Sequence, residues 1–340
     1  MPLRRPALTA SATVLALAVL LPGCGGDGGT GAQSERPAAA KLRERLNGAT
    51  EPRPGQFPRV AGRTLQKLAD ASGAAPAQAG LATSVFTPGP NRLAFGVLDS
   101  RNKFVYGPTA VYLARGPNGK ARGPFVAPAD LLVTEPPFRS RQAATDGDPF
   151  AAIYQATVDL TPGRWSVLAL TRLGNRLAGA PTQVRVVPEA RSTVVPVGAK
   201  APVVDTETLT EAGGNVEAID TRVPPDDMHD VNLRDVIGKK PVAVVFATPQ
   251  LCESRVCGPV VDIAAQLKQR YGDRMAFIHQ EVYTDNDPKK GLRVPLRRFG
   301  LQTEPWLFVI DRQGRVAARL EGSFGLDAFE KAVQDGLRER

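Results

Sequence analysis

The sequence predicts a multidomain protein, an all-β sandwich followed by an α/β domain, on the basis of three observations. Between residues 80 and 198, short runs in which apolar and polar residues alternate are separated by turn residues. From residue 199 onward, apolar runs of strand length alternate with segments of helical period. Hydrophobic residues make up 42% of the 340 residues, which is enough to build a core for each of two domains.

The N-terminus has the pattern of an export signal. Two arginines precede an uncharged apolar run over residues 7–21, which is short for a membrane span. The run ends in Leu21-Pro22-Gly23-Cys24, followed by glycine-rich sequence. This resembles the signal peptide of bacterial lipoproteins. The resemblance implies removal of residues 1–23, lipid on Cys24, and a chain anchored to the extracytoplasmic face of the cell membrane. A secreted protein with an incidental cysteine, or a short membrane-retained helix, is the alternative.

The cysteine count limits the possible classes of protein. Three cysteines exclude a disulfide-dense scaffold and a zinc site made of four thiolates. If Cys24 carries lipid, Cys252 and Cys257 remain as a pair in an oxidising compartment, where a disulfide is the expected state.

Residues 24–79 are rich in Gly, Ala, Pro and charge, and we expect them to form a flexible tether. Residues 41–45 and 63–70 could each form a turn or two of helix, but neither has an evident face to bury. The basic excess of this stretch suits either contact with anionic envelope polymers and lipids or a solvated linker. Basic residues are scattered and the compartment is extracytoplasmic, so we expect no nucleic-acid partner.

Residues 80–198 are expected to form an antiparallel β-sandwich. The turn Thr161-Pro162-Gly163 separates two of its strands, and no cluster of catalytic residues stands out. The expected strands are 91–98, 103–106, 109–114, 152–160, 165–170 and 182–187. The strand–turn–strand sequence around Trp165 resembles the immunoglobulin-like modules of bacterial envelope proteins.

Residues 199–340 are expected to form a mixed sheet with helices on both faces, because strands and helices alternate in a β-α-β-α-β-β-α order. We expect strands at 241–246, 275–282, 306–311 and 315–320, and helices at 258–271, 292–299 and 326–337.

Three sequence features of this domain resemble the thioredoxin fold, in its redoxin and envelope oxidoreductase forms. The apolar strand Val244-Val245-Phe246 is followed by Cys252 and Cys257, and the segment Thr303-Glu304-Pro305-Trp306 comes later. The resemblance covers roughly residues 200–340. It implies a cysteine pair where the first main helix begins and a cis-proline that opens a strand, so that Cys252, Cys257 and Pro305 would be the catalytic residues.

The spacing of the two cysteines departs from the family pattern, because four residues separate them instead of two. Positions i and i+5 lie about 140° apart around a helix, so we expect Cys252 in the loop and Cys257 at the helix start. A helix N-terminus favours a thiolate. Arg255 would add to this effect, whereas Glu253 and Glu304 would oppose it.

The chain therefore has two principal functional interpretations. The first is a thiol–disulfide oxidoreductase that acts on thiols or disulfides of envelope proteins, with Cys252 as nucleophile and Cys257 as resolving residue. The second is a non-catalytic binding lipoprotein in which a Cys252–Cys257 disulfide only stabilises the loop. A copper chaperone is a weaker alternative. Soft thiolates suit Cu(I), but that family has three residues between its cysteines and a distant histidine, and His279 falls within a predicted buried strand. We expect His229 and His279 to be structural or solvated, and we expect no metal or other cofactor.

Overall fold

The computed structural model describes residues 37–338, and residues 36–340 belong to one compact unit. The proposed signal, 1–23, and Cys24 lie outside the described residues. Within the described part of the chain, no helix combines the length and apolar character needed to cross a bilayer.

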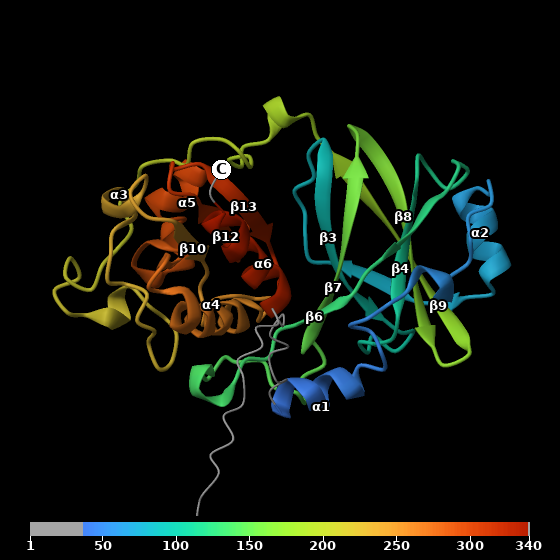
Figure 1. The fold of residues 1–340 in the computed structure, drawn as a ribbon, viewed down its shortest axis with the longest axis horizontal. Helices are drawn as coiled ribbons and strands as arrows, with labels where there is room; N and C mark the ends of the chain where they lie inside the picture. Colours follow the sequence, from blue (N-terminus) through green and yellow to red (C-terminus); the bar gives the residue numbers. More distant parts are fainter. Residues whose placement is uncertain (1–36, 339–340) are drawn as a thin grey trace, which may run out of the picture. The chain divides into compact units, whose positions relative to one another are not determined.

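The first half contains two facing β-sheets, which we call the β-sandwich (Figure 1). All pairings are antiparallel except that of β1 with β9. One sheet has the order β1 (Ala75–Pro76), β9 (Arg176–Val186), β8 (Gly163–Leu173), β4 (Thr109–Ala114) and β5 (Arg122–Val126). The other has the order β2 (Gln78–Leu81), β3 (Gly89–Leu98), β7 (Ala152–Leu160) and β6 (Ala129–Leu131). The strand expected at 103–106 makes only an isolated bridge, between Leu98 and Phe104. Its immunoglobulin-like character stays a prediction.

The flexible tether expected over residues 24–79 is wrong for the residues that the structure describes. Helices α1 (Pro37–Arg45) and α2 (Leu65–Ser72) form here, and Leu42 and Leu68 are at most 1% exposed. Strand β4 is buried at all six positions and therefore needs a cover on both faces, one of which α2 supplies. Leu65 and Leu68, on one side of α2, belong to the apolar cluster that includes Tyr112 of this strand.

The second half, residues 199–338, is the α/β half, and its predicted layout is confirmed. Its sheet has the order β11-β10-β12-β13, with β10 parallel to β11 and antiparallel to β12. The strands are β10 (Val242–Phe246), β11 (Ala276–Gln280), β12 (Trp306–Ile310) and β13 (Val316–Glu321). The helices are α3 (Leu233–Val236), α4 (Cys257–Tyr271), α5 (Val294–Phe299) and α6 (Leu326–Leu337). Short 3-10 turns occur at Pro54–Gln56, Pro136–Phe138, Glu189–Arg191, Val216–Ala218, Thr284–Asn286 and Pro288–Lys290.

Helices cover both faces of this sheet (Figure 1). Alternate residues of β10 point to opposite faces, as strand geometry requires. Ala243 and Val245 share a core with apolar residues of α4 and α6. Val244 and Phe246 face α5, where the Phe246 and Phe299 rings lie 5.1 Å apart. The sheet is therefore buried on both sides, and the start of α4 is fixed against it.

Polar contacts join the two halves. The buried Asp130 carboxylate of β6 accepts hydrogen bonds from the backbone N–H groups of Gly325, Asp327 and Ala328 and so caps the start of α6. Arg92 of β3 donates to the carbonyl of Ser323 over 2.6 Å. At the position of Gly325 a side chain would collide with Asp130, because a Cβ would lie 2.5 Å from it.

Candidate cysteine-pair site

Cys252 and Cys257 lie where the loop after β10 meets α4. The helix begins at Cys257, and Cys252 lies in the turn before it, as the spacing predicted. Arg255 has a positive φ of 60°, and its N–H donates to the carbonyl of Cys252 over 3.1 Å. This turn folds the longer cysteine spacing back, so that both sulfurs meet at the helix N-terminus. Both are free thiols in the structure.

The surroundings of Cys252 favour its thiolate. The main cause is a hydrogen bond from the Cys257 thiol, which lowers the pKa of Cys252. Partial burial acts in the opposite direction, but the Ser254 hydroxyl, 3.2 Å from the sulfur, and the backbone N–H of Cys257 also favour the charged form. The resulting pKa is about 6, well below that of an ordinary cysteine.

Cys257 has the opposite character. Burial and then the contact with Cys252 raise the pKa of Cys257 well above its usual value. Cys257 is fully buried, whereas Cys252 is 8% exposed. The pair is therefore asymmetric, with an ionisable sulfur nearer the surface and a protonated donor behind it.

Glu304 lies close enough for its charge to act on both cysteines, and Pro305 follows it in the chain. The Glu304–Pro305 peptide bond is cis, as the resemblance implied, and Pro305 immediately precedes β12. Burial, followed by repulsion from Glu253, raises the pKa of Glu304, while a hydrogen bond from Tyr283 acts against this. The Glu304 charge opposes ionisation of Cys252, as expected, but its effect is smaller than that of the hydrogen bonds.

Arg255 has a different role from the expected one. Its guanidinium lies over the ring of Phe150, 5.3 Å from the centroid, and is not among the causes that shift the pKa of Cys252. Arg255 thus connects the cysteine turn to the β-sandwich.

A cavity of about 560 Å³, which we call the cysteine groove, is lined by neighbours of the pair but by neither cysteine itself. The α/β half lines it with Ser254, Val256 and Glu304, which flank the two sulfurs in sequence or in space. The β-sandwich lines it with Leu81, Phe86 and Val184, among others. Sequence reasoning missed this contribution, because residues this far apart along the chain carry no common local pattern.

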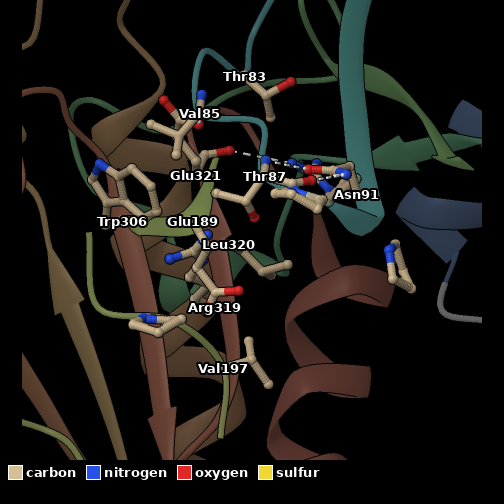
Figure 2. Close-up of a pocket in the computed structure, with 14 residues that line it drawn as sticks. Thr83, Val85, Thr87, Asn91, Glu189, Val197, Trp306, Arg319, Leu320 and Glu321 are labelled. Carbon is tan, nitrogen blue, oxygen red and sulfur yellow. Dashed lines mark hydrogen bonds between the residues drawn. The ribbon is translucent and has the colours of Figure 1, made fainter. Parts of the chain in front are cut away.

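A second cavity, of about 320 Å³, also lies between the halves, and none of its lining residues is a sequence neighbour of the two cysteines. Figure 2 shows Trp306 and Arg319 on its α/β side and Thr87 and Asn91 on the other. The Asn91 side chain accepts from the Thr87 N–H and donates to the Thr87 carbonyl, so its polar groups are already used.

The two histidines lie together in a buried cluster with Asp220 and Asp226, which we call the His–Asp cluster. One ligand atom from each of the four residues lies within 4.8 Å of the others. Sequence reasoning treated His229 and His279 separately and missed the cluster. Within the described part of the chain, no such group of three or more potential ligands includes a cysteine, so the structure gives the copper-chaperone alternative no histidine beside the pair.

Comparison with known proteins gives matches among solved structures alone. A scan against protein-family models and a search of curated proteins both find no match. Two matches are crystal structures from Chlorobium tepidum, one described as a thiol:disulfide interchange protein DsbE and the other as a thioredoxin-family thiol:disulfide interchange protein. The first is 20% identical to this chain, with a TM-score of 0.32, and the second is 17% identical, with a TM-score of 0.29. Each match covers 42% of this chain and 99% of the matched chain. An endo-β-1,4-mannanase from Thermotoga petrophila matches at 11% identity and a TM-score of 0.19, over 33% of this chain and 20% of that one.

Proposed function

We propose that this chain is a thiol–disulfide oxidoreductase. The observation that carries the proposal is the asymmetry of the pair: the pKa of Cys252 is about 6, and Cys257 is a buried thiol that donates to it. A purely structural pair has no need of a stabilised thiolate, whereas exchange requires one sulfur to attack and the other to resolve.

In the reducing direction, the Cys252 thiolate attacks one sulfur of a substrate disulfide. The substrate S–S bond breaks, a mixed disulfide forms on Cys252, and the departing substrate thiolate takes a proton. Cys257 then loses its proton and attacks the Cys252 sulfur, which releases the second substrate thiol and leaves a Cys252–Cys257 disulfide. Two electrons pass from the pair to the substrate, and the reverse sequence oxidises a substrate dithiol.

The cysteine groove is the proposed substrate site. Its volume of about 560 Å³ admits a side chain or a short extended segment of another protein. Both halves line it, so the β-sandwich, which we propose to be an immunoglobulin-like module, would help to select the substrate protein.

Exchange activity tests this proposal. The purified protein should reduce a model disulfide with a dithiol donor, and Cys252→Ser should abolish this. Cys257→Ser should instead accumulate a mixed disulfide, visible by mass spectrometry, because attack can occur but resolution cannot. As a folding control, Asp227→Asn changes an exposed carboxylate elsewhere and should keep full activity. Equal activity in wild type and Cys252→Ser would refute the proposal.

We further propose that the chain is a lipoprotein of the cell envelope, lipidated at Cys24 after removal of residues 1–23, and that its partners are envelope proteins with exchangeable thiols or disulfides. The support is the signal pattern that ends in Leu21-Pro22-Gly23-Cys24. Mass spectrometry of the mature N-terminus should find a lipid-modified Cys24. An unmodified cysteine, or a retained signal, would refute the anchor without affecting the redox proposal.

A further inference from the structure

We infer that Asp220, Asp226, His229 and His279 form a binding site for a divalent transition-metal ion such as Zn²⁺. Each of the four side chains is at most 3% exposed. Asp220, Asp226 and His229 come from the loop that precedes α3, and His279 comes from β11. The four residues include neither cysteine, and the inference does not rest on the proposed redox activity.

The spacing of the donor atoms suits tetrahedral coordination. His229 Nε2 lies 3.5 Å from Asp220 Oδ2 and 3.5 Å from Asp226 Oδ1. His279 Nδ1 lies 3.7 Å from Asp220 Oδ1 and 2.8 Å from Asp226 Oδ2. Two ligands of a tetrahedral zinc ion, each about 2.0–2.1 Å from the metal, are about 3.3 Å apart. The cluster thus requires only small movements to surround an ion, which would displace to solvent the proton of the hydrogen bond between His279 Nδ1 and Asp226 Oδ2.

The second observation concerns His229. Neither of its ring nitrogens has a hydrogen-bond partner among the described residues, although the side chain is only 3% exposed and Nε2 faces both carboxylates. A buried imidazole without hydrogen bonds is costly in a protein interior. A metal ion between His229 Nε2 and the two carboxylates would satisfy that nitrogen.

The surrounding hydrogen bonds orient the other ligands as a metal site requires. His279 Nε2 lies 3.2 Å from the carbonyl of Ala247, so that Nδ1 faces the cluster. Such a bond from the second ring nitrogen to a backbone carbonyl is the usual support of a ligating histidine. Backbone N–H groups of Arg222 and Met228 hold the carboxylates of Asp220 and Asp226 over 2.7 and 2.8 Å.

The donor set decides the class of metal. Two imidazoles and two carboxylates suit Zn²⁺ and its divalent neighbours, whereas Ca²⁺ and Mg²⁺ prefer oxygen ligands alone and Cu⁺ prefers sulfur. The ion would join the 220–229 loop to β11. Through Ala247, which directly follows β10, it would also support the segment that leads to Cys252.

Zinc binding to the metal-free protein tests the inference. The Cys252→Ser/Cys257→Ser protein is used, so that the thiols bind no metal, and it is titrated with ZnCl₂ by calorimetry. We expect one Zn²⁺ per chain and a Tm that rises with zinc concentration. In this background, His229→Ala should weaken zinc binding by more than about 10–100-fold, the loss typical when a residue that only supports a ligand is changed.

Asp227→Asn/Asp230→Asn is the matched control. These exposed acids flank the ligands in sequence but pair with Lys268, so zinc affinity should change by less than about twofold. Absence of stoichiometric zinc binding in the cysteine-free protein would overturn the inference, even if His229→Ala fails to fold. Zinc affinity that survives His229→Ala, or that the control pair abolishes, would overturn it as well.

Discussion

At Cys252, a few hydrogen bonds outweigh the cost of placing charge in a partly buried position. The Cys257 thiol and N–H and the Ser254 hydroxyl all favour the thiolate, against burial and Glu304. Each hydrogen bond to a charged group contributes about 1.5–3 kcal/mol, whereas the Glu304 charge acts without contact. The order of these effects explains how a site with acidic neighbours still favours a thiolate.

Alkylation of Cys252 should report this balance. In the reduced protein, the rate with iodoacetamide should rise as the pH rises through about 6 and level off above it, because only the thiolate reacts. Cys257→Ala should move the midpoint upward by about 1–2 pH units, since it removes the strongest hydrogen bond. Ser254→Ala should move it less. A midpoint near 8.5 in the wild type would contradict the electrostatic account.

How far the sequence predicts the site depends on which residues are close along the chain. Cys252 and Cys257 share one turn, and helical geometry was enough to place them on either side of the start of α4. The His–Asp cluster could not be foreseen in this way. Its loop residues lie 50 or more positions before His279, and the loop meets β11 in the fold, where the His279 N–H donates to the Met228 carbonyl over 3.0 Å.

At the scale of elements, the main helix α4 is joined to the rest of the chain by a buried ion pair. Asp262 lies 2.9 Å from Arg222 and also accepts hydrogen bonds from the N–H and hydroxyl of Ser140, in the segment after the 3-10 turn Pro136–Phe138. Burial raises the pKa of Asp262, while Ser140 and Arg222 oppose this shift. Asp262 therefore connects α4 to the loop that contains Arg222 and to the segment that contains Ser140.

Removal of one partner of this pair should be costly. Asp262→Ala should lower the free energy of unfolding by about 3–5 kcal/mol, because it leaves the Arg222 guanidinium buried and unpaired. Asp205→Ala is the matched control, since it breaks an exposed Asp–Arg pair with Arg234 and should have little effect. Urea unfolding monitored by circular dichroism measures both. Similar losses in the two variants would show that the buried pair has no special role.

The elements themselves were predicted unevenly. The strands after residue 199 and helices α4, α5 and α6 have strong periodicity and were foreseen, including the mixed sheet, whereas the four-residue helix α3 was not. Helices α1 and α2 were not, because each buries only one or two leucines and the remaining positions are polar or small. The apolar side of α2 becomes evident only when β4 is seen to need a cover on its outer side, and Leu42 of α1 packs into the larger core cluster instead.

At the scale of the whole molecule, the contact between the halves depends on Asp130. Burial, and then repulsion from Asp327, raise the pKa of Asp130 to about 6, although the backbone N–H groups it caps and the Arg92 guanidinium favour its charge. No sequence pattern reveals this contact, because Asp130 and Gly325 lie 195 residues apart. The folded protein thus holds a proton here that the unfolded chain releases near pH 4.

The contribution of Asp130 to stability should depend on pH, because its pKa differs between the folded and the unfolded chain. Its folded pKa lies above the unfolded value, so the contribution is complete below about pH 4 and is lost as the pH rises to about 6. As the pH rises over this range, the free energy of unfolding of the wild type should therefore fall by about 2 kcal/mol relative to that of Asp130→Asn. Urea midpoints at pH 4, 5 and 6.5 measure it. A difference that does not change with pH would contradict the assignment.

The central claim is that the Cys252–Cys257 pair exchanges electrons with a substrate and is not a permanent bond. A stabilised Cys252 thiolate favours the reduced form and makes the disulfide easier to reduce. Equilibration of the purified protein with glutathione buffers, followed by alkylation and mass spectrometry, measures the reduction potential directly. We predict a value between about −270 and −120 mV, the range of exchange-active proteins. A potential below about −300 mV would contradict the account and identify the pair as a structural disulfide.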